Sequence, residues 1–581
     1  MTETIRRPSE EKPWRNILPS KNVNEDVPEL SAYRFMLKAN ENNRNGVALI
    51  HFKTPLKFKK LASLIEAYAA SFKAIGVKEG DLVSFVSLAV PDCIASVYAL
   101  SKIGATANMI DPRMDGKSIA DRIKKSNSKV LIVLDAVLDK VMPILDDVKQ
   151  DHVLIHRVSR HLSFMLGHIV DKRIRQAIGM KIPYGTKNIT KWEDFISKGA
   201  GKSVDDAPYK GDATVAITYT GGTTGVPKGV MITNKSMNAV ALNFMNWGID
   251  YKPGQRFLGI IPIFSSYGMV CGMHMPLCMN QQLIPIAKFN PAEFGKLIRN
   301  YRPNHMISTP AFYEMMMESD EVKGLDMSFV ITLGSGGDTM NEGLEQKLKD
   351  FMKEHNIRYP LAQGYGMSEL SAAATFGVNN IHKAGSVGIP SPNTTIGIFD
   401  PETGEELTYN TDGEICITGP SMMKGYWNMP EETANIMRKH DDGKVWIHSG
   451  DIGHIDEEGF LFVVGRIKRM ITRFDGHKVF PSTIEGVIVA HEAVSNSSVV
   501  AVKDLDHGQG DQPIAIVEIK DGYDRDAICR EIMQKCLEEC EERGRPVAVV
   551  AIDAIPMTGM GKNDYRTLEK QYYHYDYKKK A

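Results

Sequence analysis

The chain has few cysteines, no long apolar run and almost no net charge. Its seven cysteines are an odd number scattered over 581 residues, which is not the pattern of a disulfide framework and indicates a reducing compartment. Nowhere do 18 uncharged apolar residues follow one another, and the N-terminal residues lack the apolar stretch of a signal peptide. We therefore expect a cytoplasmic protein without a transmembrane segment.

The charge balance excludes a partner that is attracted by the overall electric field of the protein. Lys and Arg number 70 and Asp and Glu 71, so the formal charge is -1 and no overall field attracts nucleic acid. Any charge effect must be local. Because single cores stop growing at roughly 250 to 300 residues, the length predicts two to four domains.

A loop rich in glycine and threonine is the clearest sign of a ligand site. Glycines let backbone N–H groups approach an anion, threonines offer hydroxyl donors, and a lysine adds positive charge. The residues concerned are Thr220, Gly221, Gly222, Thr223, Thr224, Gly225 and Lys228. A strand-like run at residues 214–219 precedes them, and we expect the order strand, glycine loop, helix that forms a phosphate cradle. Lys228 is followed by Gly229, so the spacing is not that of a P-loop.

Two further predicted strands, at residues 329–333 and 358–362, also end in glycine loops. Ligands of open α/β sheets bind at the carboxyl ends of strands, so we expect the three loops to converge on one crevice. Helical segments alternate with short β-rich runs between about residues 60 and 135, which favours an α/β fold.

The basic segment at residues 161–175 carries apolar residues at helical spacing. Two interpretations are open. The segment is a helix on a membrane surface, giving a peripheral membrane contact, or it is the solvated face of an ordinary docked helix, which we favour.

A charge-dense turn at residues 465–469 marks a boundary, and roughly 115 residues of βαβ-like pattern follow it. Cys529, Cys536 and Cys540 share one face of a predicted helix. With no histidine or second cysteine pair nearby, core packing is a better interpretation than a metal site. The aromatic, basic tail at residues 571–580 is expected to be mobile.

Five motifs in one order resemble the acyl-adenylate-forming superfamily, on its acyl-CoA synthetase branch. The motifs are the loop at residues 220–229, Gly364–Glu369, Gly413–Ile415 with Gly425–Tyr426, Ser449–Asp451 with Gly465–Arg466, and Thr558–Lys562. The resemblance covers about residues 45–570. It implies a large N-terminal adenylation domain of several subdomains at residues 1–467, with the ATP and acyl sites, and a small mobile α+β domain at residues 468–581.

The resemblance implies an ATP-dependent ligase reaction in two halves. A carboxylate attacks the α-phosphate of ATP to give acyl-AMP and pyrophosphate, and the thiol of CoA then attacks the acyl carbonyl and releases AMP. Cations must offset the charge of the first step. Lys562 is the implied catalytic lysine, and Glu369 with Thr224 is the implied Mg²⁺ site. Lys468 is the implied hinge about which the small domain turns, so that Lys562 leaves before the thiol arrives.

The implied nucleotide site draws on every motif. Tyr365 lies against the adenine, Gly337 lines the adenine and acyl-carbonyl region, and Asp451 accepts hydrogen bonds from both ribose hydroxyls. Its other residues, besides the phosphate loop, are Asp338, Gly364, Gly366, Ser368 and Arg466. The plain alternatives are a surface carboxylate for Glu369, a loop-capping one for Asp451 and a solvated lysine for Lys562.

Three positions bear on the acyl and CoA sites. Ser265 stands where family members with a CoA-type site often have a histidine, which leaves a wider pocket unless Tyr267 or a neighbour fills it. Gly476 matches the glycine that leaves room for pantetheine in CoA ligases. This match favours a pantetheine thiol, which CoA and a carrier-protein arm share. Because nothing here resembles a carrier or condensation domain, we expect free CoA as the acceptor, with a carrier-protein arm as the alternative. Near the hinge, Arg469 replaces a residue that is normally acidic.

The acid is less defined than the reaction. The Met-rich stretch Met269–Met279, with Phe244 and Trp247, either lines an aliphatic pocket or packs in the core. A medium- or long-chain fatty acid is favoured, with aryl and sterol acids behind it. The alternative functions are an adenylating enzyme that loads a carrier protein and, from another class, a non-catalytic nucleotide-binding regulator. The sequence gives no oligomeric state.

Overall fold

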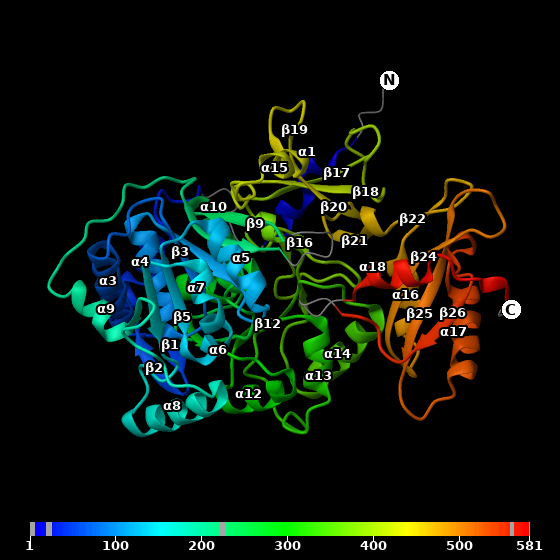
Figure 1. Ribbon diagram of the computed structural model, residues 1–581. Helices are drawn as coiled ribbons and strands as arrows, with labels where there is room; N and C mark the ends of the chain where they lie inside the picture. Colours follow the sequence, from blue (N-terminus) through cyan, green and yellow to red (C-terminus); the bar gives the residue numbers. More distant parts are fainter. Residues whose placement is uncertain (1–5, 19–25, 221–226, 558–562, 580–581) are drawn as a thin grey trace.

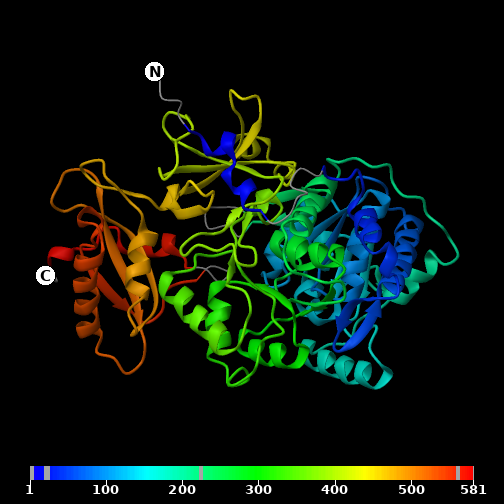
Figure 2. The ribbon, with the colours of Figure 1, turned by 180° about the vertical axis from the view of Figure 1, so that it is seen from behind.

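The computed structural model describes residues 6–18, 26–220, 227–557 and 563–579, which form a large α/β body, a small antiparallel sheet on top of it and a separate C-terminal unit (Figures 1 and 2). The α/β class predicted from the sequence is correct. Among the described helices, none is long and apolar enough to cross a membrane.

The first sheet of the body has seven strands in the order β7-β6-β5-β3-β4-β8-β9. All neighbours are parallel except β8 and β9. The strands are β3 (Leu82–Val86), β4 (Thr106–Ile110), β5 (Val130–Leu134), β6 (His152–His156), β7 (Ile189–Lys191), β8 (Thr214–Tyr219) and β9 (Gly229–Thr233). Every residue of β5 is buried, as expected of a parallel strand covered on both faces.

The second sheet also has seven strands, in the order β14-β13-β12-β10-β11-β1-β2. Only β2 runs antiparallel to its neighbour. The strands are β1 (Val47–His51), β2 (Thr54–Lys57), β10 (Arg256–Gly259), β11 (Gln282–Pro285), β12 (His305–Ser308), β13 (Thr332–Ser335) and β14 (Ala362–Gln363). The strands predicted at residues 329–333 and 358–362 correspond to β13 and β14. Each of them begins and ends later in the sequence than predicted.

Helices cover both sheets. The main ones are α2 (Ala32–Ala39), α3 (Phe58–Ala74), α4 (Pro91–Ile103), α5 (Gly116–Ser126), α8 (Phe164–Ile178), α9 (Trp192–Lys198), α10 (Asn234–Asn246), a π-helix (Tyr267–His274), α11 (Met275–Cys278), α12 (Phe294–Tyr301), α13 (Pro310–Met317) and α14 (Glu342–Glu354). Every residue of α4 is buried. The helix begins with Pro91 and ends at Gly104 with a φ of 73°, which are the start and stop that such residues favour.

The small sheet is antiparallel. Its order is β17-β18-β20-β19, and β21 pairs with β20. The bounds are β17 (Thr395–Phe399), β18 (Gly413–Thr418), β19 (Met437–Lys439), β20 (Val445–Ile455) and β21 (Leu461–Arg466), with α15 (Pro430–Ile436) beside β19. Gly465 and Arg466 therefore end a strand, and the turn predicted at residues 465–469 is confined to the 3-10 helix Ile467–Arg469.

The C-terminal unit has its own apolar core. Its elements are β22 (Ile471–Thr472), β23 (Lys478–Val479), α16 (Pro481–Val489), β24 (Val494–Lys503), β25 (Asp511–Ile519), α17 (Arg525–Glu539), β26 (Val549–Ile552) and α18 (Tyr565–Tyr572). Cys536 is buried in this core, so core packing was the right interpretation of that cysteine. The tail is packed instead of mobile. Tyr577 is buried and accepts a hydrogen bond from Leu505 N at 2.8 Å.

Candidate active site

The base of the glycine and threonine loop is closed by two hydrogen bonds. Thr220 N donates to Lys228 O at 3.0 Å, and Lys228 N donates to Thr220 Oγ1 at 3.1 Å. Residues 221–226, which include the predicted Gly221, Gly222, Thr223, Thr224 and Gly225, lie outside the described residues.

The chain leaves this loop as β9, which is antiparallel to β8, and α10 begins only at Asn234. The predicted order of strand, glycine loop and helix is therefore wrong. No helix N-terminus faces the loop from that side, so backbone N–H groups, hydroxyls and Lys228 are what the loop itself offers to a phosphate.

Glu369 is buried beside Tyr426, whose hydroxyl donates to Glu369 Oε1 at 2.5 Å. Burial raises the pKa of Glu369, and the hydrogen bond from Tyr426 opposes this rise. Lys228 Nζ lies 4.9 Å from the centroid of the Tyr426 ring and also pairs with Glu432. Tyr426 thus connects the lysine of the phosphate loop with the predicted metal ligand.

Asp451 joins residues from two of the motifs. The Tyr365 hydroxyl donates to Asp451 Oδ2 at 2.7 Å, and Arg466 Nε lies 2.8 Å from Asp451 Oδ1. Asp451 is only 3% exposed. It follows Gly450, whose φ of 71° turns the chain. The residues assigned by resemblance to adenine and ribose are therefore in direct contact.

The glycine loops after β13 and β14 lie side by side, as predicted. Gly364 N donates to Ser335 O at 2.8 Å, and a Cβ on Gly336 would lie 3.1 Å from Gly364 O. A Cβ on Gly366 would lie 1.8 Å from Ala372 O, so only glycine fits there. The phosphate loop follows β8 of the other sheet, so the three loops come from two sheets instead of one.

The remaining residues of these two loops differ in exposure. Gly337 is exposed with a φ of 86°, and Asp338 is exposed with its Oδ1 accepting a hydrogen bond from Thr339 N at 3.0 Å. Ser368 begins the 3-10 helix Ser368–Leu370, which carries Glu369. Asp338 thus lies at the solvent side of the loop.

Ser265 shapes the backbone of its own turn. Its Oγ donates to Pro262 O at 2.8 Å and accepts from Gly268 N at 3.1 Å. Tyr267 begins the π-helix and extends toward the loop after β13, where a Cβ on Gly336 would lie 3.5 Å from the Tyr267 hydroxyl. Tyr267, and not Ser265, therefore fills the space beside the glycine loop.

The Met-rich stretch belongs to the protein core. Met269, Met273 and Met275 are buried, and the Phe244 and Trp247 rings pack with centroids 5.1 Å apart. Core packing accounts for these residues, so they carry no argument for an aliphatic pocket.

The residues predicted at the hinge lie between the body and the C-terminal unit. Lys468 is exposed in the 3-10 helix Ile467–Arg469. Arg469 Nη2 lies 2.5 Å from Glu485 Oε1, and its guanidinium carbon is 5.0 Å from the centroid of the Tyr565 ring. The positive charge of Arg469 is thus paired within the C-terminal unit.

Two predicted residues lie further along this unit. Lys562 is outside the described residues, and the chain resumes at Asn563, whose Nδ2 donates to Ser497 O at 2.8 Å. Gly476 is exposed in the turn between β22 and β23 with a φ of 79°, and a Cβ there would meet no atom within 4 Å. Its backbone conformation is reason enough for glycine at this position.

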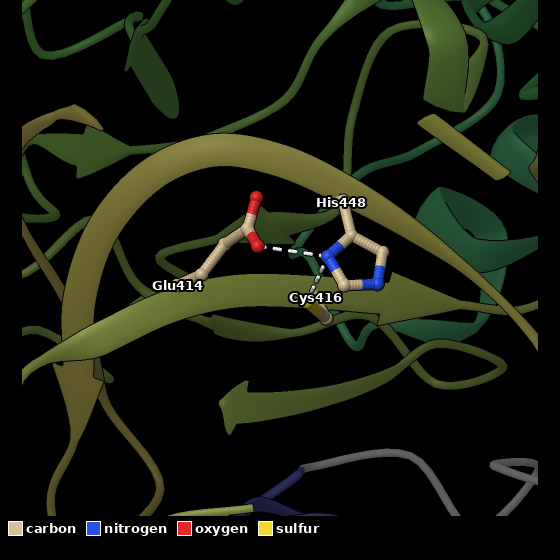
Figure 3. A group of neighbouring side chains, drawn as sticks. All are labelled: Glu414, Cys416 and His448. Atoms are coloured by element: carbon tan, nitrogen blue, oxygen red, sulfur yellow. Dashed lines mark hydrogen bonds and ion pairs between the residues drawn. The ribbon is translucent and has the colours of Figure 1, made fainter. Parts of the chain in front are cut away.

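A neighbouring group escaped sequence analysis. His448 Nδ1 lies 2.7 Å from Glu414 Oε2 and 3.5 Å from Cys416 Sγ (Figure 3). Gly450 N donates to Glu414 Oε1 at 3.1 Å, so this carboxylate holds the residue next to Asp451. Burial opposes ionisation, but the hydrogen bond with His448 lowers the pKa of Glu414. The sequence signal that could have revealed this group is the spacing of Glu414 and Cys416, which are two positions apart in one strand, together with His448, which directly precedes the Ser449–Asp451 motif.

The comparisons with known proteins identify the class. The family model for the AMP-binding enzyme matches residues 37–427, and that for the AMP-binding enzyme C-terminal domain matches residues 483–562. The chain is 28% identical to the long-chain-fatty-acid–CoA ligase of Bacillus subtilis (strain 168), over 86% of this chain and 88% of that protein. It is 30% identical to 4-coumarate–CoA ligase 1 of Arabidopsis thaliana, over 77% and 76%.

The fold comparison agrees. The crystal structure of the anthranilate CoA ligase AuaEII in complex with anthranoyl-AMP superposes with a TM-score of 0.79 at 17% identity, over 94% of this chain and 97% of that one. The chain therefore belongs to the AMP-binding enzyme family, and within it groups with the acid–CoA ligases.

Proposed function

We propose that this enzyme activates a carboxylic acid with ATP through an acyl-AMP intermediate and then transfers the acyl group to the thiol of CoA. The observation that carries the proposal is the contact of Tyr365 with the ion pair of Asp451 and Arg466, which joins two motifs that lie far apart in the sequence. A buried carboxylate beside an aromatic side chain suits a ribose with a base stacked next to it. The similarity to two CoA ligases supports CoA as the acceptor.

In the nucleotide site, we assign Asp451 to the ribose and Tyr365, with Gly337 and Asp338, to the adenine. Both Asp451 oxygens already have protein partners, Tyr365 and Arg466. The diol therefore enters a polar site that is held in place before it binds, which lowers the ordering cost of binding.

The phosphates are assigned to the loop between Thr220 and Lys228. In the described structure Lys228 pairs with Glu432, a contact that a polyphosphate must replace. Thr220 and Lys228, at the two ends of the loop, are hydrogen bonded to each other. Replacing the ion pair with Glu432 by contacts to a polyphosphate therefore moves the Lys228 side chain and leaves β8 and β9 paired.

Glu369, with Thr224, is the proposed Mg²⁺ site. Carboxylate oxygen is the ligand that Mg²⁺ prefers, and the raised pKa of buried Glu369 reflects a negative charge without enough compensation, which fits a cation there. When bound, Mg²⁺ would neutralise phosphate charge during adenylation. Tyr426 holds Glu369 Oε1 and so orients the carboxylate.

We propose a boundary after residue 467, with Lys468 as the hinge and Lys562 as the lysine that bridges the carboxylate and the α-phosphate. Separate cores on the two sides of this point support it, because the core of the C-terminal unit includes Ile471 onward. Rotation about the hinge would withdraw Lys562 and admit the thiol past Gly476.

The acid we favour is a medium- or long-chain fatty acid. The similarity to the fatty-acid ligase of Bacillus subtilis supports it, and the comparable similarity to 4-coumarate–CoA ligase 1 makes an aryl acid the competitor. Tyr267, which fills the space beside the glycine loop, is the side chain we assign to limiting the acyl site, with Ser265 supporting its turn. We also propose that the enzyme acts in the cytoplasm, and the lack of a disulfide among the described residues supports this.

The test is release of pyrophosphate and AMP from MgATP over a panel of fatty and aryl acids, with and without CoA. CoA-dependent turnover on fatty acids would support the full proposal, and turnover on aryl acids alone would correct the substrate. A single burst of pyrophosphate that CoA does not extend would overturn CoA as the acceptor and favour a carrier protein. No adenylation of any acid would favour a regulator.

A further inference from the structure

Helix α8 has two apolar sides, and only one of them is covered. Figures 1 and 2 show it on the outside of the body beside β2. Val170 and Ile174 pack against the core and Ile178 is buried. On the other side Phe164 is 91% exposed, Met165 77% and Ile169 48%. A docked surface helix normally presents polar residues to water, so this exposed side needs an explanation.

Positive charge continues along the same exposed side. Lys172, Arg173 and Arg175 are all exposed. The one acidic residue of the helix, Asp171, is paired on the protein side, with its Oδ2 3.5 Å from Arg157 Nη1. The exposed side of α8 therefore has apolar side chains in its first turns and uncompensated positive charge in its last turns. This is the composition of helices that lie in the interface of an anionic membrane.

A basic cavity of about 330 Å³ lies beside the start of α8. It is lined by Lys57, Lys59 and Lys60, by His51 at the end of β1, and by His161, which precedes α8 by three residues. All three lysines are exposed, and none of them forms an ion pair with a carboxylate of the described residues. Three such lysines lining one cavity suit a phosphate.

His51 lines the cavity but is itself buried. The side chain is 2% exposed, and its Nε2 donates to Val158 O at 2.8 Å. Burial lowers the pKa of His51. The lysines of the cavity are exposed, and they are therefore the groups that a phosphate would contact.

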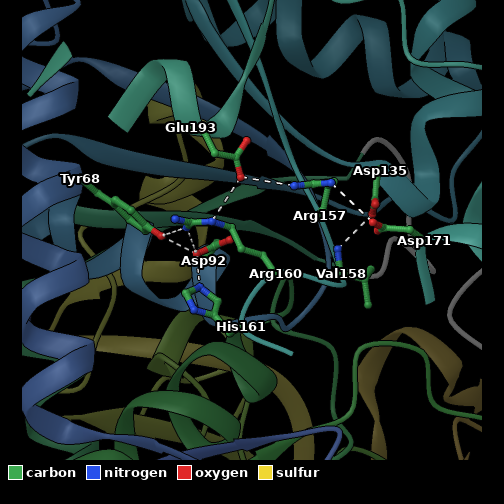
Figure 4. Close-up of polar contacts among 9 residues, drawn as sticks. All are labelled: Tyr68, Asp92, Asp135, Arg157, Val158, Arg160, His161, Asp171 and Glu193. Carbon is green, nitrogen blue, oxygen red and sulfur yellow. Dashed lines mark hydrogen bonds and ion pairs between the residues drawn. The ribbon is translucent and has the colours of Figure 1, made fainter. Parts of the chain in front are cut away.

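The segment that joins the cavity to α8 is firmly held (Figure 4). Buried Asp92 accepts from Arg160 Nη1 at 3.0 Å and lies 2.7 Å from His161 Nε2. Complete burial opposes ionisation of Asp92, but His161 and Arg160 lower its pKa nonetheless. Val158 N donates to Asp135 at 3.1 Å. The cavity and the exposed side of α8 thus form one rigid surface, and we call the two together the α8 surface.

We propose that the α8 surface docks on an anionic phospholipid membrane, with Phe164, Met165 and Ile169 inserted among the lipids and a headgroup phosphate held by Lys57, Lys59 and Lys60. The charge complementarity selects this occupant over a neutral apolar partner. Phe52, 44% exposed with its ring centroid 4.8 Å from that of His51, extends the apolar rim on the cavity side. The proposal does not rest on the proposed function, because binding needs neither ATP, acid nor CoA.

The test is co-sedimentation of the full chain with vesicles of phosphatidylcholine alone and with vesicles in which about a third of the lipid is phosphatidylglycerol, whose headgroup carries a phosphate and hydroxyls. We expect binding to the anionic vesicles only. The double variant Phe164→Glu with Met165→Glu should abolish it, and the triple variant with Gln at Lys57, Lys59 and Lys60 should weaken it roughly tenfold or more. Free glycerol 1-phosphate should compete weakly with the vesicles.

Matched controls distinguish docking through the α8 surface from nonspecific electrostatic or hydrophobic adsorption to the vesicles. Leu537→Glu replaces an apolar side chain of α17 that is 42% exposed, and Gln at Lys124, Lys125 and Lys129 removes three exposed lysines near the start of β5. Because β5 and β6 are parallel and α8 follows the carboxyl end of β6, these lysines lie at the other end of the sheet. Both controls should bind as the wild type does.

Three results would overturn the proposal. The first is equal binding to neutral and anionic vesicles, and the second is equal loss in the control variants. The third is self-association in sedimentation velocity that Phe164→Glu with Met165→Glu abolishes while vesicle binding is absent, which would make the α8 surface an interface between two copies of the chain. All substituted side chains are exposed, so the variants should keep the wild-type thermal transition.

Discussion

Asp451 and Arg466 face each other across the antiparallel pair of β20 and β21, and Arg466 Nε lies 2.8 Å from Asp451 Oδ1. Cross-strand register, and not proximity in sequence, brings this carboxylate and this guanidinium together. Tyr365 then reaches the second oxygen of the same carboxylate from the loop after β14. The ribose site that we propose is thus built from a hairpin of the small sheet and a loop of the body.

Replacing Asp451 should therefore affect ATP more than the acid. Asp451→Asn keeps one carbonyl acceptor but loses the charge and the second acceptor oxygen, which costs about one charged hydrogen bond of roughly 1.5–3 kcal/mol, so we expect the apparent KM for ATP to rise roughly ten- to a hundredfold. The KM for the acid should change little. Steady-state kinetics with Asp212→Asn, an exposed carboxylate, as the control checks this. An unchanged KM for ATP would argue against the ribose role.

Glu369 predicts a pH dependence of the Mg²⁺ requirement. Burial raises the pKa of Glu369. As the pH falls, this carboxylate is therefore protonated at a higher pH than the carboxylate of an ordinary glutamate. Apparent Mg²⁺ affinity should weaken as the pH is lowered through this raised pKa. Tyr426→Phe removes a hydrogen bond that lowers the pKa, so the weakening should begin at a higher pH. Mg²⁺ titrations of pyrophosphate release over a pH series test both, and superimposable profiles would contradict the assignment.

Glu414 predicts an indirect effect on the same site. It accepts from Gly450 N at 3.1 Å and so fixes the turn that carries Asp451. Glu414→Ala should raise the KM for ATP severalfold with a smaller effect on kcat, because the turn loosens while the reacting groups stay in place. Glu414→Gln keeps a carbonyl acceptor and should be milder. Equal effects of the two variants on KM would indicate that Gly450 does not depend on this acceptor.

Lys562 predicts a split between the half-reactions. Lys562→Ala should reduce adenylation by several orders of magnitude while leaving most of the thioester-forming step from supplied acyl-AMP, because the lysine serves only the first orientation. Lys570→Ala, in the same unit, is the matched control. The two half-reactions are measured separately with pyrophosphate release and CoA thioester formation. Equal loss of both would refute the assignment.

Asp135 predicts a pH-dependent gain in stability. Burial, with the nearby charge of Asp171, raises its pKa from 3.8 to about 6. As the pH rises, the unfolded state therefore loses this proton first, so stability is lost between pH values of about 4 and about 6 and the full cost of burying the carboxylate is present above that. Asp135→Asn keeps an acceptor for Val158 N and should raise the free energy of unfolding by up to about 3 kcal/mol at pH 8 and by almost nothing at pH 4.

Calorimetric melting at the two pH values measures this difference. Asp139→Asn, at an exposed position in the same region, controls for the loss of a negative charge. A gain of the same size at both pH values would mean that the amide improves packing and that ionisation of Asp135 is not the cause.

Much of the site was readable in the sequence because its chemistry is local. A glycine at residue 366, a strand ending at Tyr219 and a serine, glycine and aspartate in a row depend on backbone conformation, which nearby residues specify. The α/β class followed for the same reason, since β5 is a continuous apolar run and α3 has helical periodicity. The order after the phosphate loop could not be predicted, because strand pairing of β9 with β8 is a non-local contact.

The sequence by itself determined the family, the reaction class and the residues that contact one another along a motif, because these depend on short-range patterns of residue type. Only the tertiary structure decided what long-range packing controls. It placed Tyr426 between Lys228 and Glu369, tied Glu414 to Gly450, and left the apolar side of α8 facing water. Such relationships join residues 36, 57 or more positions apart, or depend on which face of a helix packs against the body. No local stretch of the chain specifies either of them.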